Sequence, residues 1–214
     1  MAAALIKICG ITDTAALDAA ISARAHFIGL VFFAKSPRHL DPARAAMLAR
    51  HAAGRIGVVG LFVDPAPDYL AQVLATVPLE RVQLHGHETP ADIAAIRAAH
   101  GLPVWKALAV TTRADIAAAD RFAGAAERVL FDAKPPEGAD LPGGNGLRID
   151  WAVLRGVRPP LPWMLAGGLD VDTVAEALTI SQAPAVDVSS GVESAPGIKD
   201  PARIAAFCAA VRGA

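Results

Sequence analysis

The feature that most constrains this chain is the regular alternation of apolar, strand-like runs with alanine-rich helical patterns. Eight runs rich in β-branched and large apolar residues recur along the sequence, at residues 4–9, 26–33, 55–63, 81–85, 103–110, 128–133, 162–167 and 185–190. Most of these runs are continuously apolar, which is typical of parallel strands buried on both faces. The chain is therefore expected to build a parallel sheet covered by helices.

Several helical patterns begin with residues that favour the start of a helix. Thr112 and Asp115 have the spacing of a capping box, with Asp in place of the usual Glu. Three patterns begin with an oxygen-bearing residue followed by proline: Asp41-Pro42, Thr89-Pro90 and Asp200-Pro201. The side-chain oxygen caps free N–H groups, and proline at the first helical position lacks an N–H that would have no partner there. These caps support a strand–helix unit repeated eight times.

Eight such units predict a single-domain (β/α)8 barrel, or TIM barrel, over residues 1–214. The alternative is a doubly wound open sheet, which would need fewer strands and a G-x-G-x-x-G turn after the first strand. The sequence has no such turn at that place. A stretch rich in Pro and Gly at residues 134–146 follows the sixth strand, and its length predicts an active-site loop.

The composition argues against several classes of protein. Lys and Arg number 20 and Asp and Glu number 21, so there is no basic excess and nucleic acid is a poor candidate partner. The longest apolar stretch, around residues 27–34, is far too short to span a bilayer, so no membrane association is expected. The first ten residues do not resemble a signal peptide. We therefore expect a cytoplasmic protein.

The potential metal ligands and thiols are few and scattered. There are six histidines, no H-x-x-x-H and no C-x-x-C, so a metal site is not indicated. The two cysteines, Cys9 and Cys208, lie near opposite ends of the chain and form no disulfide framework. Free cysteines suit a reducing compartment. Cys208 falls inside the last helical pattern and is expected in the core.

Two glycine turns follow the last two predicted strands and point to an anion. One is LAGGL, with Gly167 and Gly168, and the other is DVSSGVE, with Ser190 and Gly191. Glycine lets the backbone approach an anion closely, and a helix that follows directs free N–H groups at it. Late paired turns of this kind are where such barrels hold a phosphate. The predicted ligand is a small phosphorylated molecule.

Polar residues at the ends of the first and sixth strands are candidates for proton transfer. Cys9 ends the first strand, and Lys7 shares its face by strand alternation. Asp132 ends the sixth strand, where burial could raise its pKa enough for it to act as a general acid. The alternatives are a buried apolar role for Cys9 and a structural salt bridge for Asp132, with Lys134 or Arg128 as partner.

Three more polar residues lie at predicted strand ends. Arg38 follows the Ser-Pro turn after the second strand and could bind a carboxylate through its planar fork, or it could be a solvated loop charge. His85 ends the fourth strand and could be a base or a hydrogen-bonded structural histidine. Asp187 in the eighth strand could orient the phosphate turn or pair with a lysine such as Lys7. Together with Arg38, the residues Lys7, His85 and Asp187 are the candidates for binding the substrate.

The motifs together resemble a known family. KICGIT, FFAKSPRHL, VGLFVD, VQLHG, LFDAK followed by GGNG, LAGGL and VDVSSGVESAPGIKD occur in this order and cover nearly the whole chain. The set is similar to phosphoribosylanthranilate isomerase of tryptophan biosynthesis. The resemblance implies a (β/α)8 barrel without cofactor that converts N-(5-phosphoribosyl)anthranilate to its 1-deoxyribulose 5-phosphate derivative, an Amadori rearrangement. It also implies a small phosphoribosyl substrate and a monomer or homodimer.

The resemblance implies a role for each matching residue. Cys9 of KICG would be the general base, and Asp132 of LFD would be the general acid. Arg38 would bind the anthranilate carboxylate. The phosphate turns would be formed by Gly167, Gly168, Ser190 and Gly191.

Other phosphosugar barrels fit the sequence less well. An indole-glycerol-phosphate synthase would be expected to use a lysine–glutamate pair, and a histidine-pathway isomerase two aspartates on strands one and five. The present chain has Cys9 on strand one and Lys106 on strand five. A non-catalytic phosphosugar-binding barrel is a further alternative, because it would keep the glycine turns without needing Cys9 opposite Asp132. A turnover assay separates these classes.

Overall fold

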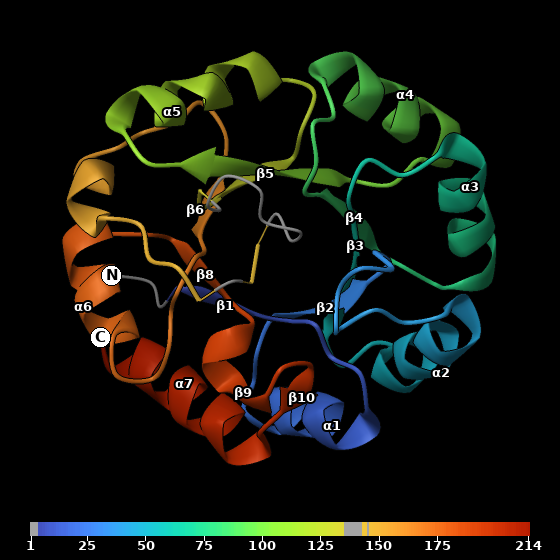
Figure 1. Cartoon of the computed structure of the whole chain (residues 1–214), viewed down its shortest axis with the longest axis horizontal. Coiled ribbons are helices and arrows are strands. Elements are labelled where there is room, and N and C mark those ends of the chain that lie inside the picture. The colour runs from blue at the N-terminus through green and yellow to red at the C-terminus, as the bar shows by residue number, and fades with distance from the viewer. Residues whose placement is uncertain (1–3, 135–142, 145) are drawn as a thin grey trace.

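A computed structural model describes residues 4–134, 143, 144 and 146–214 of the chain. Eight parallel strands close into a barrel in chain order, with β1 paired to both β2 and β8. Figure 1 looks along the barrel and shows the helices as an outer ring around the strands. The expected (β/α)8 barrel is confirmed. Its strands are β1 Leu5–Cys9, β2 Phe27–Val31, β3 Gly57–Phe62, β4 Arg81–Leu84, β5 Val104–Val110, β6 Arg128–Ala133, β7 Trp163–Leu165 and β8 Ala185–Val188.

The outer ring contains seven α-helices in the part of the chain that the structure describes, rather than one after every strand. The helices are α1 Thr14–Ser22, α2 Pro42–Ala52, α3 Pro67–Thr76, α4 Pro90–His100, α5 Arg113–Ala117, α6 Val174–Ser181 and α7 Pro201–Gly213. Between β6 and β7 the described residues form only a short 3-10 helix, η2 Trp151–Leu154. Gly156 and the prolines at 159, 160 and 162 interrupt that segment, because proline cannot continue a helix.

The predicted helix starts are confirmed by their hydrogen bonds. The Asp41 carboxylate accepts from two backbone N–H groups at the start of α2, and Asp200 does the same at the start of α7. Thr89 forms a full capping box with Asp92 in α4. The Asp115 carboxylate accepts from the Thr112 backbone N–H and hydroxyl. Each cap satisfies donors that the first helical turn leaves open.

The core lies in two concentric layers. The large outer layer packs the outward faces of the strands against the helices, and includes Ile6, Ile8, Phe62 and Phe207, all fully buried. A small inner cluster fills the lower part of the barrel, with Val59, Trp105, Leu130 and Met164 among its members. These bulky side chains close the barrel below, so a ligand can reach its interior only from the carboxyl ends of the strands.

A small hairpin that follows β8 was not predicted from the sequence. The second glycine turn continues as the 3-10 helix η3 Ser190–Val192, and an antiparallel pair follows, β9 Glu193–Ala195 and β10 Ile198–Lys199. Helix α7 begins only beyond this pair. The hairpin turns at Pro196-Gly197, where Gly197 has φ +81°. The expectation of a helix directly after this turn is therefore wrong, because the hairpin comes before α7.

The expected loop at residues 134–146 lies mostly outside the described residues. Lys134, Gly143, Gly144 and Gly146 are described, and the last three line the cavity at the barrel mouth.

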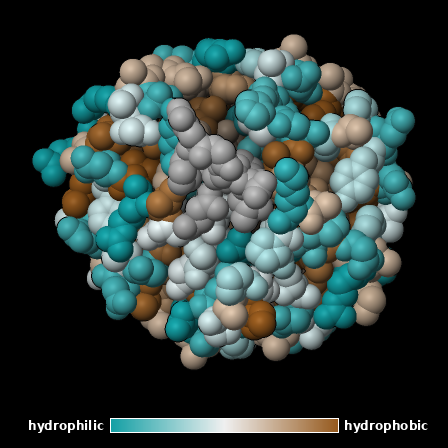
Figure 2. Space-filling view, viewed as in Figure 1, coloured by the Kyte–Doolittle hydropathy of each residue, from teal (hydrophilic) through white to brown (hydrophobic). Residues whose placement is uncertain are grey.

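The described residues on the side seen in Figure 1 form no continuous apolar face, because Figure 2 shows the hydrophobic ones as separate patches between hydrophilic ones. Within the described ranges, no helix is long and apolar enough to cross a membrane.

Candidate active site

A cavity opens at the carboxyl ends of the strands and collects most of the predicted site residues. Its lining includes Cys9, Arg38, His85, Asp132, Gly167, Gly168, Asp187 and Ser190. These residues come from six different strands or the loops that follow them. Val31, Phe33, Leu61 and Val63 give the same cavity an apolar wall. A site of this composition suits a ligand with both polar and flat apolar parts.

Cys9 shares the inward face of β1 with a buried ion pair. Lys7 Nζ donates to Asp187 Oδ1 over 2.9 Å, which confirms the pairing considered from the sequence. Burial disfavours the charged ammonium, but the charges of Asp187 and Cys9 outweigh burial and raise the pKa of Lys7. Burial raises the pKa of the Cys9 thiol, and the Lys7 ammonium partly opposes that shift by favouring the thiolate. Lys7 itself does not line the cavity.

Gly29 makes room for these two side chains. A Cβ at Gly29 would lie 2.8 Å from Cys9 Sγ and 3.2 Å from Lys7 Nζ. Both groups therefore lie against the backbone of β2, which is paired to β1 at this level. A larger residue there would push the cysteine and lysine apart, so the glycine permits the arrangement.

Asp132 lies directly beside His85 in the wall of the cavity. His85 Nε2 lies 3.1 Å from Asp132 Oδ2, and both side chains are nearly buried. The other carboxylate oxygen of Asp132 accepts from the Ala133 backbone N–H over 2.8 Å. Asp187, the partner of Lys7, also interacts electrostatically with Asp132 and His85. Lys134 and Arg128, the structural partners considered for Asp132, make no ion pair with it in the described part of the chain.

Arg38 is buried, so the alternative of a solvated loop charge is wrong. Its side chain is only 7% exposed and forms a two-pronged ion pair with Glu193, through Nε at 2.7 Å and Nη2 at 2.9 Å. The Ser36 hydroxyl accepts from the Arg38 backbone N–H and shapes the turn. Sequence reasoning missed Glu193, because its motif is read as part of the glycine turn. Arg38 nevertheless lines the cavity.

The two glycine turns follow β7 and β8, which are neighbours in the barrel. Gly167 and Gly168 have φ values of +84° and +62°, which an L side chain rarely adopts. A Cβ at Gly168 would lie 2.6 Å from the Leu147 carbonyl oxygen. Gly191 packs against the backbone of Leu169 and does not line the cavity, whereas Ser189, which was not predicted, does. The two turns thus form one continuous polar edge.

Lys106 on β5 has a structural environment. Its Nζ lies 3.1 Å from Glu88 Oε2 and donates to the Gly86 carbonyl over 2.7 Å. Neither Lys106 nor Glu88 lines the cavity. Among the described residues, no group of three or more His, Cys, Asp or Glu side chains is placed to hold a metal ion.

Comparison with known proteins matches this chain to one family. The family model described as N-(5'phosphoribosyl)anthranilate (PRA) isomerase matches residues 6–210. The N-(5'-phosphoribosyl)anthranilate isomerase of Paramagnetospirillum magneticum is 57% identical over 208 residues, which is 97% of each chain. The isomerase of Rhodospirillum centenum is 54% identical over 205 residues, covering 95% of this chain and 96% of that one. This chain belongs to the phosphoribosylanthranilate isomerase family.

Solved structures of the isomerase family share the fold over almost the whole chain. The phosphoribosyl anthranilate isomerase of Thermotoga maritima has a TM-score of 0.87 and 32% identity, covering 99% of this chain and all of that one. A second structure of the family is in complex with reduced 1-(o-carboxyphenylamino)-1-deoxyribulose 5-phosphate, with a TM-score of 0.84, 30% identity and the same coverage. The family resemblance drawn from the motifs is therefore confirmed.

Proposed function

We propose that this chain isomerises N-(5'-phosphoribosyl)anthranilate to 1-(2-carboxyphenylamino)-1-deoxyribulose 5-phosphate with Cys9 as general base and Asp132 as general acid. The observation that carries this assignment is that one cavity holds a thiol beside a buried lysine, a carboxylate beside a histidine, an arginine and two glycine turns. Family membership gives the reaction, and the residues that line the cavity support this assignment of its steps.

The reaction requires proton transfers at two places on the sugar. Asp132 donates a proton to the furanose ring oxygen as the bond from this oxygen to C1' breaks, which leaves a protonated Schiff base. Cys9, as the thiolate, then removes the proton from C2' and produces an enolamine. Transfer of a proton to C1' and loss of the C2' hydroxyl proton give the ketone, so substrate and product are isomers. Positioned acids and bases of this kind contribute about 10²- to 10⁴-fold each.

The two ends of the substrate have separate partners in this proposal. The phosphate would bind the edge formed by Gly167, Gly168, Ser189 and Ser190, where positive φ values bring the backbone close. The anthranilate ring would lie against the apolar wall with its carboxylate on Arg38. Binding at both ends positions the reacting carbons between Cys9 and Asp132.

The direct test is turnover by the purified protein. Anthranilate derivatives fluoresce, so consumption of phosphoribosylanthranilate is followed continuously as the fluorescence falls. Loss of substrate at a rate proportional to enzyme concentration, with the carboxyphenylamino product identified by mass and chromatography, is expected. Binding without turnover would instead support a phosphosugar-binding barrel.

We also propose a cytoplasmic monomer or homodimer. One solved structure shows monomers generated from the dimeric phosphoribosylanthranilate isomerase of Thermotoga maritima, which is 31% identical to this chain with a TM-score of 0.81. Light scattering coupled to size exclusion distinguishes the two states by mass.

A further inference from the structure

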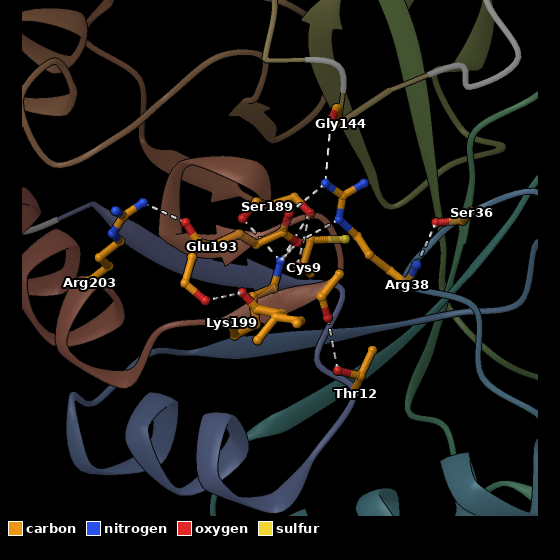
Figure 3. Close-up of polar contacts among 12 residues, drawn as sticks. Cys9, Thr12, Ser36, Arg38, Gly144, Ser189, Glu193, Lys199 and Arg203 are labelled. Atoms are coloured by element: carbon orange, nitrogen blue, oxygen red, sulfur yellow. Dashed lines mark hydrogen bonds and ion pairs between the residues drawn. The ribbon is translucent and has the colours of Figure 1, made fainter.

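The Arg38 guanidinium is held from one edge by a carboxylate that is not part of the cavity wall. The Glu193 carboxylate accepts hydrogen bonds from Nε and Nη2 of Arg38. Glu193 does not line the cavity. Figure 3 shows the Arg38 side chain directed toward Glu193, with dashed lines joining the two. Two parallel hydrogen bonds from a planar fork fix the plane and the direction of the guanidinium.

Glu193 is itself fixed by a second cation and by the backbone. Lys199 Nζ donates to Glu193 Oε1 over 2.6 Å, and also to the Ser189 carbonyl over 3.0 Å. Burial opposes ionisation of Glu193, but hydrogen bonds from Arg38 and Lys199 outweigh burial and lower its pKa. Arg203 donates to the Glu193 carbonyl oxygen. Glu193 is therefore an ionised group with little freedom to move.

The aliphatic part of the Arg38 side chain is also closely packed. A Cβ at Gly10 would lie 2.5 Å from Arg38 Cδ, so the glycine leaves room for the arginine stem on the loop after β1. On the other side, Nη2 lies 3.4 Å from the Gly144 carbonyl oxygen. In the ranges that the structure describes, no hydrogen bond from Nη1 is found. A Cβ at Gly144 would lie 2.7 Å from Nη1, so this edge lies beside that glycine at the barrel mouth, and among the described residues its hydrogens are left for a ligand in the cavity.

We propose that Glu193, braced by Lys199, is a positioning residue that selects a carboxylate on the substrate's aromatic ring by holding the Nη1 edge of Arg38 toward the cavity. The inference rests on the proposed function, because it takes the ring carboxylate as the partner of Arg38. A guanidinium fixed before binding loses less rotamer freedom when the ligand arrives. The glutamate thereby acts through Arg38 rather than on the substrate.

A purely electrostatic role for Glu193 gives the opposite expectation. A carboxylate beside Arg38 weakens the attraction of the site for a second carboxylate. On that basis, Glu193→Gln would strengthen binding of a ring carboxylate, since the cluster gains one positive charge. If Glu193 instead positions Arg38, Glu193→Gln should weaken binding of the ring carboxylate, because an amide offers one acceptor oxygen where the two hydrogen bonds from the guanidinium need two.

Equilibrium binding of two analogues tests the proposal without turnover. One is reduced 1-(o-carboxyphenylamino)-1-deoxyribulose 5-phosphate, and the other is the same molecule with phenyl in place of carboxyphenyl. Calorimetry gives both dissociation constants, and their ratio isolates the carboxylate contact. The wild type should prefer the carboxylate, and Glu193→Gln should reduce this preference about tenfold or more, the scale of a charged hydrogen bond. Binding of the phenyl analogue should change little.

Three variants make the result decisive. Glu88→Gln is the matched control, because it also removes a buried glutamate from its lysine, Lys106, and should leave the preference unchanged. Lys199→Met/Glu193→Gln removes both charges, so the net charge of the cluster is kept and no lysine is left buried alone. It should lose the preference too, and it replaces the single variant if that variant fails to fold. Arg38→Lys should lose the preference directly.

The outcomes separate the inference from the function on which it rests. An unchanged or greater preference in Glu193→Gln, or equal weakening of both analogues, would overturn the positioning role while Arg38→Lys still loses the preference. A wild type without any preference for the carboxylate would overturn the role of Arg38 as well. Loss of preference in Glu88→Gln would show a general effect of removing buried charge and would also overturn the inference.

Discussion

His85 Nε2 lies 3.1 Å from Asp132 Oδ2, at the carboxyl ends of two strands that are not neighbours in the barrel. A Cβ at Gly143 would lie 2.7 Å from that oxygen and 2.9 Å from that nitrogen, so the backbone of Gly143 lies close to the pair. Asp132, the proposed acid, therefore contacts the His85 ring and lies close to the backbone of Gly143. This relationship gives the first prediction.

Asp132→Asn should reduce kcat by about 10²- to 10⁴-fold, because the amide keeps the shape of the carboxyl but cannot donate an acidic proton. Binding of the reduced product analogue should change little. His85→Gln should have a smaller effect, since it preserves a hydrogen-bond partner for Asp132 while removing the titratable ring. Steady-state kinetics and calorimetry check both variants. A normal kcat for Asp132→Asn would mean that Asp132 only binds a cation.

Cys9→Ala should remove nearly all turnover and leave the fold intact, because truncation by one sulfur at a strand end disturbs little packing. General-base loss costs about 10²- to 10⁴-fold. Cys208→Ala is the matched control. Cys208 is buried in α7, where burial raises its pKa to about 11, so it should have no part in catalysis. The fluorescence assay and a thermal melt separate lost chemistry from lost structure.

The pH dependence of kcat/KM should report the Cys9 thiolate. Burial raises the pKa of Cys9, so activity should increase with pH as the thiol ionises. Lys7 opposes that shift, and Lys7→Met should therefore move the rising limb to higher pH. Removing one partner of a buried ion pair also destabilises the fold by about 3–5 kcal/mol. A limb that does not move would show that the thiolate of Cys9 is not the base.

Lys7→Met/Asp187→Asn is the companion variant. It removes the unpaired buried carboxylate and should recover much of the lost stability. Asp187 raises the pKa of Cys9 less than Lys7 lowers it, so the rising limb should lie between the wild type and Lys7→Met. Denaturant unfolding and the kcat/KM profile measure the two effects separately.

Arg38→Lys should lower catalytic efficiency about ten- to a hundredfold or more, in part through KM. Lysine keeps the charge and loses the fork, and a charged hydrogen bond is worth about 1.5–3 kcal/mol. Inorganic phosphate should inhibit this variant as well as the wild type, because the glycine turns are untouched. Weaker phosphate inhibition alongside lower efficiency would place Arg38 in the phosphate site and contradict binding at two separate ends.

Treatment with a strong chelator followed by dialysis should leave the turnover rate unaltered. The sequence has no metal-ligand motif, and the proposed steps are proton transfers between side chains and substrate. Rate measurements before and after chelation, with and without added divalent ions, check this. Activity that returns only with an added ion would contradict the proposed mechanism.

The sequence by itself determined the strands, most helix starts and the chemistry-bearing strand ends. Continuous apolar runs mark β1 to β8 because burial on both faces leaves no polar alternation, and local caps such as Asp41 and Thr89 act within one turn of helix. Cys9 was a candidate because it ends a strand and shares a face with Lys7, and Asp132 because a carboxylate at the end of a buried strand is costly without a partner.

Only the tertiary structure decided which of these groups meet. Arg38 and Glu193 are 155 positions apart, and their contact depends on barrel closure and on the β9–β10 hairpin bringing both to the same edge. The same applies to His85 and Asp132, whose positions at strand ends were predicted but whose contact was not. Residue periodicity gives the face of a strand on which a side chain lies. Long-range strand pairing and packing decide what stands opposite, and no local pattern encodes that.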